Sequence, residues 1–311
     1  MKRVAGIGNK IVAAMILLIT VTAIFIPSID FTEKLQDYLV HILFFLLVSG
    51  LIGLIISNKI ILFTSFGCAA ALALFLKNAS NTELKNPKAH HQDKLTVVHI
   101  NLSSITDVET VIKIINESSV DLISFQEYTP DWANIIPKIA GEKFPFNHEE
   151  VRIDIYGKAV FSKYPIRNLK IIEFADIPNI AIEIVKNNLN FKIFSTYMTP
   201  ALEKQSKSIA KNQFEKLEKF IKSETGGLIV LGEFNQVYWS HDIISFRNRT
   251  GLLNSRKNVD ISTLKMPYDH IFYAPYFECS RFEELNDSLA NHIGCKASFQ
   301  IKTNKIRENK Y

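Results

Sequence analysis

Three long apolar runs dominate the first quarter of the chain. They cover residues 11–27, 39–56 and 60–76, and none of them contains Asp, Glu, Lys or Arg. Each run is close to the ~17–20 residues that an α-helix needs to cross the hydrocarbon core of a bilayer. The pattern therefore predicts a three-helix transmembrane anchor within residues 1–76. A cleaved signal peptide is an alternative for the first run alone, because basic residues precede it.

The charges around these runs predict an orientation in the membrane. Lys2, Arg3 and Lys10 favour a cytoplasmic N-terminus, because cytoplasmic flanks of membrane spans are rich in Lys and Arg. Three crossings would then place the rest of the chain outside the cytoplasm. Four lysines after the third run favour the opposite side, namely Lys77, Lys85, Lys88 and Lys94. We expect a multi-pass protein of the inner (plasma) membrane with an extracytoplasmic soluble domain.

Residues 77–94 are polar and predict a linker between the membrane and the soluble domain. They include Pro87 and the pair His90-His91. Two adjacent histidines can bind a metal ion, but in a linker without further ligands they are more commonly solvated.

From residue 95 onward, short apolar segments alternate with amphipathic ones, which is typical of an α/β domain. Helices are expected at 107–117 and 201–222, and Asn187-Asn188 indicates a hairpin turn between two strands. The domain is expected to cover residues 95–303, before a tail at 304–311. We expect strands at 95–102, 120–126, 158–161, 169–174, 180–185, 189–196, 228–231, 268–274, 277–282 and 293–301.

Composition narrows the possible functions only slightly. The net charge of +5 suits a substrate that carries phosphate, but it lacks the strong basic excess of a dedicated nucleic-acid binder. The three cysteines do not have the spacing of a metal site. A disulfide between Cys279 and Cys295 is conceivable outside the cytoplasm. No feature of the sequence indicates a protein partner.

Polar residues cluster where the predicted strands end. Each of them alone has an ordinary structural explanation, such as a turn residue or a surface carboxylate. Together they supply the groups that phosphoester hydrolysis needs: oxygen ligands for a hard cation, groups that position water, and a histidine beside an acid. The clusters are Asn101, Gln126-Glu127, Gly232-Glu233-Phe234-Asn235, Tyr268-Asp269-His270 and Asn291-His292.

This ordered set resembles the signature of the endonuclease/exonuclease/phosphatase superfamily. The family order is a strand-end Asn, a Gln-Glu, a Gly-Asp-x-Asn, an Asp-His and a terminal Ser-Asp-His. Residues 156–166, which end in Ser162-Lys163-Tyr164-Pro165-Ile166, and residues 211–214 also look like family segments. The resemblance covers residues 95–301 and implies the four-layered α/β sandwich of deoxyribonuclease I.

The resemblance also implies roles for the site residues. Glu127, helped by Asn101, would bind Mg²⁺ or Mn²⁺. Glu233 and Asn235 would align the attacking water and the scissile phosphate. The substrate would be a phosphate ester of nucleic acid or of a lipid head group.

The end of the chain would supply the remaining groups. His292 would contact the phosphoryl oxygens or transfer a proton, and Asp269 would orient its imidazole through a hydrogen bond. Tyr197, Asn291 and the amide of Asn235 would contact the substrate.

Three positions depart from the family pattern. Glu233 stands where the family has Asp, Asn291 replaces the Asp of the terminal Asp-His, and Tyr197 replaces a strand-end His. A shift of about 1 Å in a positioning group can lower a rate ~10²-fold. Two hypotheses follow: a metal-dependent phosphodiesterase, nuclease or phosphatase tethered to the membrane, or a weakened or inactive relative that serves as a membrane-bound binding module. A transporter fits poorly, because the spans carry no charges that mark a pathway.

Overall fold

The computed structural model describes residues 2–25, 35–81, 94–105, 107–257 and 266–302. The chain forms two compact units. One contains Met1–Thr82 with the segments Val237–Ile244 and Asn258–Met266, and the other contains the remaining residues. The expected tail at 304–311 and the pair His90-His91 lie outside the described residues, as does most of the expected linker.

The long helices described in the first unit are α1 (Lys2–Phe25), α3 (Leu39–Ile55) and α4 (Lys59–Ala79). A tight turn joins α3 to α4, in which Asn58 caps α4 by accepting a hydrogen bond from the backbone N–H of Ile61 at 3.3 Å. A Cβ atom at Gly53 would lie 2.8 Å from the backbone nitrogen of Leu62. The absence of a side chain at Gly53 therefore lets these two helices approach closely.

The structure corrects the expected number of spans. Within the described residues, two helical segments are long and apolar enough to cross a membrane, Ile7–Phe25 and Lys59–Ala79. The middle run forms α3, which has only 17 residues because the chain turns at Ser57, where φ is 56°. At about 1.5 Å per residue, a helix of this length spans less than the ~30 Å of a bilayer core.

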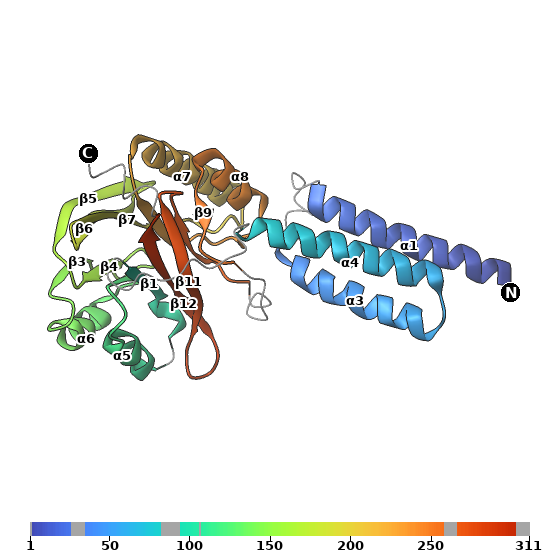
Figure 1. Cartoon of the computed structure of the whole chain (residues 1–311), viewed down its shortest axis with the longest axis horizontal. Coiled ribbons are helices and arrows are strands. Elements are labelled where there is room, and N and C mark those ends of the chain that lie inside the picture. Colours follow the sequence, from blue (N-terminus) through green and yellow to red (C-terminus); the bar gives the residue numbers. More distant parts are fainter. Residues whose placement is uncertain (1, 26–34, 82–93, 106, 258–265, 303–311) are drawn as a thin grey trace. The chain divides into compact units, whose positions relative to one another are not determined.

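The second unit contains two mixed six-stranded sheets (Figure 1). The first has the order β11-β12-β1-β2-β4-β3 and the second the order β5-β6-β7-β8-β10-β9. The strands are β1 (Leu95–Asn101), β2 (Leu122–Gln126), β3 (Phe146–Glu150), β4 (Lys158–Ser162), β5 (Ile166–Phe174), β6 (Ile177–Lys186), β7 (Leu189–Tyr197), β8 (Leu228–Glu233), β9 (Leu253–Asn254), β10 (Asp269–Tyr273), β11 (Phe277–Asn286) and β12 (His292–Ile301).

Apolar side chains from both sheets form one buried cluster, which includes Val97 and Leu122 of the first sheet and Leu231 of the second. The other face of the first sheet packs against α5 (Val108–Asn116) and α6 (Pro130–Ala140). Aromatic contacts of Phe214 and Phe246, from α7 (Lys204–Ser223) and α8 (His241–Thr250), cover the other face of the second sheet. This two-sheet α/β arrangement agrees with the expected sandwich.

Most expected elements are confirmed. The hairpin turn has positive φ at both Asn187 and Asn188, as a type I′ turn requires. The helices α6 and α8 and the strands β3 and β9 were not expected. Two prolines obscure the periodicity of α6, Pro130 in its first turn and Pro137 inside it. All three cysteines are buried, and the conceivable disulfide between Cys279 and Cys295 is not formed in this structure.

Candidate active site

The site lies where strands of the two sheets end at one edge. Strands β1 and β2 are parallel, and Asn101 pairs with Gln126 at their carboxyl ends. Strand β12 runs antiparallel to β1, so its first residue, His292, lies at the same edge. In the other sheet Asp269 pairs with Glu233. The topology thus brings together residues that are far apart in the sequence, as the strand-end pattern predicts.

Two carboxylates share one amide group in this site. The side-chain nitrogen of Asn101 donates to Glu233 Oε2 at 2.9 Å and to Glu127 Oε1 at 3.4 Å. Asn101 Oδ1 accepts from the backbone N–H and the hydroxyl of Ser103. Glu127 directly follows β2 and has a φ of 58°, in the left-handed region. Asn101 therefore presents its amide nitrogen to the two carboxylates, and the oxygen that was expected to help bind a cation is instead bonded to Ser103.

The electrostatics of this carboxylate pair favour a cation. Burial, followed by the negative charges of Asp269 and Glu127, raises the pKa of Glu233 to about 8. Within the described residues no three His, Cys, Asp or Glu side chains are grouped as a metal site. Mg²⁺, however, is commonly held by one or two carboxylates, with water in its other positions. Glu127 and Glu233 fit that requirement.

Asp269 is buried between two histidines. Its Oδ2 atom lies 2.8 Å from His292 Nε2, and its Oδ1 atom lies 3.1 Å from His99 Nε2. Although burial opposes ionisation, the hydrogen bonds with His292 and His99 hold the pKa of Asp269 well below its usual value. The expected pair of Asp269 and His292 is thus present in the structure. His99 was missed, because one histidine inside an otherwise apolar strand gives no signal of its partner.

His292 has a carboxylate near each ring nitrogen. Besides Asp269 on Nε2, Glu284 Oε2 lies 3.0 Å from Nδ1. Glu284 in turn forms an ion pair with the buried guanidinium of Arg256. For His292 to contact a phosphoryl oxygen, one of its ring nitrogens would have to leave Asp269 or Glu284 and bond to the substrate instead.

The expected substrate contacts divide into two groups. Tyr197 is buried, bonds to Asn235, and has its pKa raised by burial and then by the charge of Glu233, so it lies close to the carboxylate pair. Asn235 also donates to the backbone oxygen of Met198 at 2.8 Å. Asn291 is exposed, and its amide donates to Asp287 Oδ2 at 3.0 Å in the turn before β12. No contact described here joins Asn291 to the other site residues.

Sequence reasoning also missed Lys158. This residue starts β4 opposite Gln126, is fully buried, and donates from Nζ to Gln126 Oε1 at 2.6 Å. Nζ lies 5.9 Å from the centre of the Tyr197 ring. Burial lowers the pKa of Lys158 to about 7, although the negative charge of Glu233 acts in the opposite direction.

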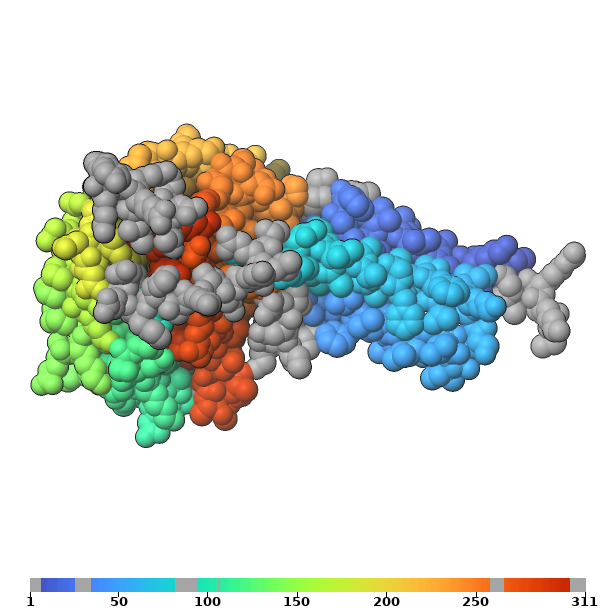
Figure 2. Space-filling model, viewed as in Figure 1, coloured from blue at the N-terminus to red at the C-terminus, as the bar shows by residue number. Residues whose placement is uncertain are grey.

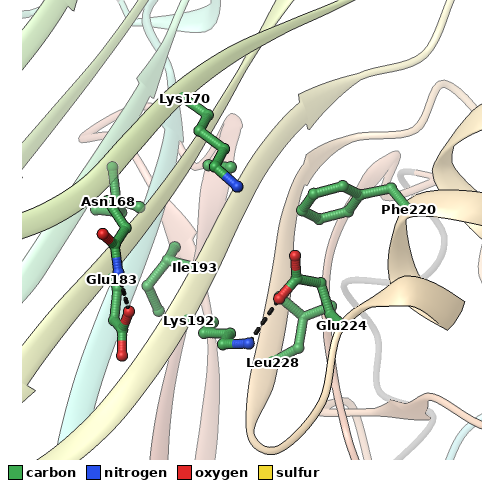
Figure 3. Close-up of a pocket in the computed structure, with 10 residues that line it drawn as sticks. Asn168, Lys170, Glu183, Lys192, Ile193, Phe220, Glu224 and Leu228 are labelled. Carbon is green, nitrogen blue, oxygen red and sulfur yellow. Dashed lines mark hydrogen bonds and ion pairs between the residues drawn. The ribbon is translucent and has the colours of Figure 1, made fainter.

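A surface cavity lies away from this site. It has a volume of about 310 Å³ and lies along β5, β6 and β7 beside the end of α7, with Lys170, Lys192, Glu224 and Phe220 among its lining residues (Figure 3). Lys192 there pairs with Glu224 at 2.6 Å. None of its lining residues belongs to the strand-end site. The chemistry of the strand ends, rather than cavity size, therefore locates the candidate active site.

Comparisons with known proteins agree with this placement. Residues 99–298 match the model of the Endonuclease/Exonuclease/phosphatase family. No curated protein matches the chain significantly.

Solved structures show the same fold at low sequence identity. An endonuclease/exonuclease/phosphatase from Beutenbergia cavernae DSM 12333 aligns with a TM-score of 0.55 and 12% identity, over 67% of this chain and 72% of that one. A family protein from Bacteroides thetaiotaomicron gives 0.53 and 14%, over 68% and 96%. Humanized D. rerio TDP2 gives 0.53 and 11%, over 67% and 99%. With the family model covering most of the α/β unit, the chain belongs to the endonuclease/exonuclease/phosphatase family.

Proposed function

We propose that this chain is a divalent-metal-dependent phosphoesterase. The observation that carries the proposal is the meeting of two partly buried carboxylates, Glu127 and Glu233, beside the hydrogen-bonded pair of Asp269 and His292. Members of the family are phosphoesterases. The substrate classes that we propose are phosphate esters of nucleic acid and of lipid head groups.

Different residues of the site would bind the metal ion, bind the phosphate and orient the histidine. Glu127 and Glu233 would hold Mg²⁺ or Mn²⁺, which when bound would neutralise charge that develops on the phosphoryl group. Asn235 and Tyr197 would donate hydrogen bonds to phosphate oxygens. Asp269 fixes the orientation of the His292 imidazole, which would contact the phosphoryl group.

The test is hydrolysis of a chromogenic phosphodiester by the full chain in detergent. With Mg²⁺ or Mn²⁺ we expect hydrolysis that EDTA abolishes and that Glu127→Gln lowers ~10²-fold or more, in the range of lost electrostatic stabilisation. Glu109→Gln, which neutralises an exposed carboxylate in the first turn of α5, is the matched control. Hydrolysis that is equal in the wild type and Glu127→Gln would refute the proposal.

A second candidate function is an inactive binding module. It is favoured by the carboxylate on each side of His292 and by the departures at Glu233 and Asn291. Restoring the family residues, Glu233→Asp with Asn291→Asp, should then create activity that the wild type lacks. A restored variant that stays as inactive as the wild type would argue against a lost catalytic role for these two positions.

We also propose that the helical unit tethers the enzyme to a lipid bilayer. The surface of its helices, blue to cyan in Figure 2, exposes large apolar side chains. Among them, Ile55 is 81% exposed, and Leu18, Phe63 and Leu74 are 64–72% exposed. Such surface is stable in hydrocarbon but not in water. The chain should remain in the membrane pellet after an alkaline carbonate wash, and its release into the supernatant would contradict tethering.

The number of crossings decides the side on which the enzyme works. Three crossings place the soluble domain opposite the N-terminus, in the extracytoplasmic space that the N-terminal charges favour. Two crossings, by α1 and α4, return it to the side of the N-terminus. Protease added to cells without an outer barrier should cleave the domain in the first arrangement and leave it intact in the second.

A further inference from the structure

Lys158 has an unusual environment for a lysine. It is fully buried, and within the described part of the chain its only hydrogen-bond acceptor is Gln126 Oε1 at 2.6 Å. An ammonium group carries three N–H donors and is rarely buried without a carboxylate partner. Taking such a charge out of water costs several kcal/mol unless nearby negative charge offsets it. The position therefore needs an electrostatic explanation.

The nearby negative charge is that of the carboxylate pair. Lys158 Nζ lies 5.9 Å from the centre of the Tyr197 ring, and Tyr197 pairs with Glu233 between β7 and β8. In keeping with this proximity, the charge of Glu233 raises the pKa of Lys158, and the charge of Lys158 lowers that of Glu233. The strand register explains the proximity, because Lys158 pairs with Gln126 and the next residue along the chain is Glu127. Lys158, the first residue of β4, is thus buried next to the end of β2, from which the chain continues into Glu127.

Asp269, the third carboxylate beside this pair, has other partners than Lys158. Asp269 is already hydrogen-bonded by His99 and His292, one on each oxygen. Among the described residues, the hydrogen-bond donor that Glu127 and Glu233 share is the neutral amide of Asn101. Lys158 is therefore the basic side chain best placed to balance these two carboxylates.

We propose that Lys158 is an internal counter-cation of the Glu127–Glu233 pair that sets the balance between cation and anion binding in the site. Its positive charge weakens the affinity for a divalent cation and strengthens the affinity for an anionic phosphate group. It is a positioning residue, because its buried ammonium contacts Gln126 and would act on bound ions through space. The inference rests on the proposed function, since it assumes that the pair binds a divalent cation.

The first test is Mn²⁺ binding by titration calorimetry on the full chain in detergent at about pH 6.5, where the folded chain still holds the Lys158 proton. Lys158→Met keeps most of the side-chain volume but removes the charge. It should tighten Mn²⁺ binding by roughly tenfold or more, since that is the order expected for one charge acting on a divalent ion several ångströms away even at the dielectric constant of water, about 80. Lys158→Gln should act in the same direction, which guards against a packing effect of the methionine. Lys163→Met is the matched control, because Lys163 follows the opposite end of β4 and bonds to the backbone of Ser118. This control should leave Mn²⁺ affinity unchanged.

The second test uses inorganic phosphate as the probe, added to the Mn²⁺-loaded chain. Lys158→Met should weaken phosphate binding by a factor of roughly 5–10, opposite to its effect on Mn²⁺. In a Glu233→Gln background the effect of Lys158→Met on Mn²⁺ affinity should persist through Glu127. Opposite shifts for the two ions are the signature of a charge effect, because a purely structural disturbance would weaken both.

The outcomes separate this inference from the proposed function. Mn²⁺ binding that is equal in the wild type and Lys158→Met, or weaker in the variant, overturns the role of Lys158 while leaving the phosphoesterase proposal in place. Binding in Lys158→Met but not in the wild type supports the role of Lys158 and contradicts metal dependence of the natural chain. Absence of binding in both overturns both.

Discussion

Burial of Lys158 should make the soluble domain less stable at neutral pH than at alkaline pH. Burial lowers the pKa of this lysine from 10.5 to about 7 in the folded chain. Between these values the unfolded chain binds the proton and the folded chain does not, so the free energy of unfolding rises with pH. The destabilisation is fully present below pH about 7 and disappears above about 10.5. At about 1.4 kcal/mol per pKa unit it reaches at most about 5 kcal/mol.

Lys158→Met removes this cost but leaves Gln126 Oε1 without its donor. The lost hydrogen bond costs about 1–3 kcal/mol, so the variant should be about 2–4 kcal/mol more stable than the wild type at pH 7. At about 2–4 °C per kcal/mol for a domain of this size, Tm should rise by about 4–16 °C. The gain should shrink steadily as the pH increases toward 10.

A thiol-reactive dye provides the assay, because Cys279 and Cys295 are fully buried in the soluble domain and react only when it opens. Melting curves of the full chain in detergent are compared between pH 7 and 9.5. An unchanged or lower Tm in Lys158→Met at pH 7 would falsify the assignment of a buried charge. Lys163→Met, at a partly exposed lysine, should change Tm by less than about 2 °C.

Three further predictions concern the site and its framework. Asp269→Asn should lower kcat about 10–100-fold, because His292 loses its orienting carboxylate, and an unchanged kcat would show that the imidazole needs no such partner. Gly294→Ala should destabilise the chain by more than about 3 kcal/mol, because φ is 153° and a Cβ would lie 2.0 Å from a backbone oxygen of β1. Gly226→Ala, with open space around it, should cost about 1 kcal/mol. Equal melting temperatures of the two variants would contradict this difference. Tyr197→Phe should raise KM about fivefold with little change in kcat, and a fall in kcat alone would assign the hydroxyl to the reaction step instead.

The sequence predicts the α/β unit well because its local signals agree with one another. Asp107 caps α5 by accepting a hydrogen bond from the backbone of Thr110 at 2.7 Å, and the Asn187-Asn188 turn forms as its residues require. The strand-end clusters other than Asn291 also lie together as expected, since the parallel strands end and the antiparallel strands begin at one edge. These features depend on neighbours in the sequence or on one simple rule of topology.

The features that were missed depend on contacts between distant segments. Lys158 begins an apolar strand and looks like its polar boundary, and only the folded structure shows that the side chain is covered. His99 meets Asp269 across 170 residues of sequence, so no local spacing reports the contact.

The departure at Glu233 should be interpreted together with Lys158. A glutamate in place of an aspartate extends the carboxylate by one methylene, and here it reaches Asn101 at 2.9 Å while remaining within the electrostatic influence of the buried ammonium. Changing Glu233 to Asp alone would move a charge whose counter-cation stays in place. The effects of Glu233→Asp and Lys158→Met on cation binding should therefore be non-additive, since coupled buried charges commonly show interaction energies of about 0.5–3 kcal/mol. Additive effects would mean that the two residues act independently, and the longer side chain at position 233 would then need a different explanation.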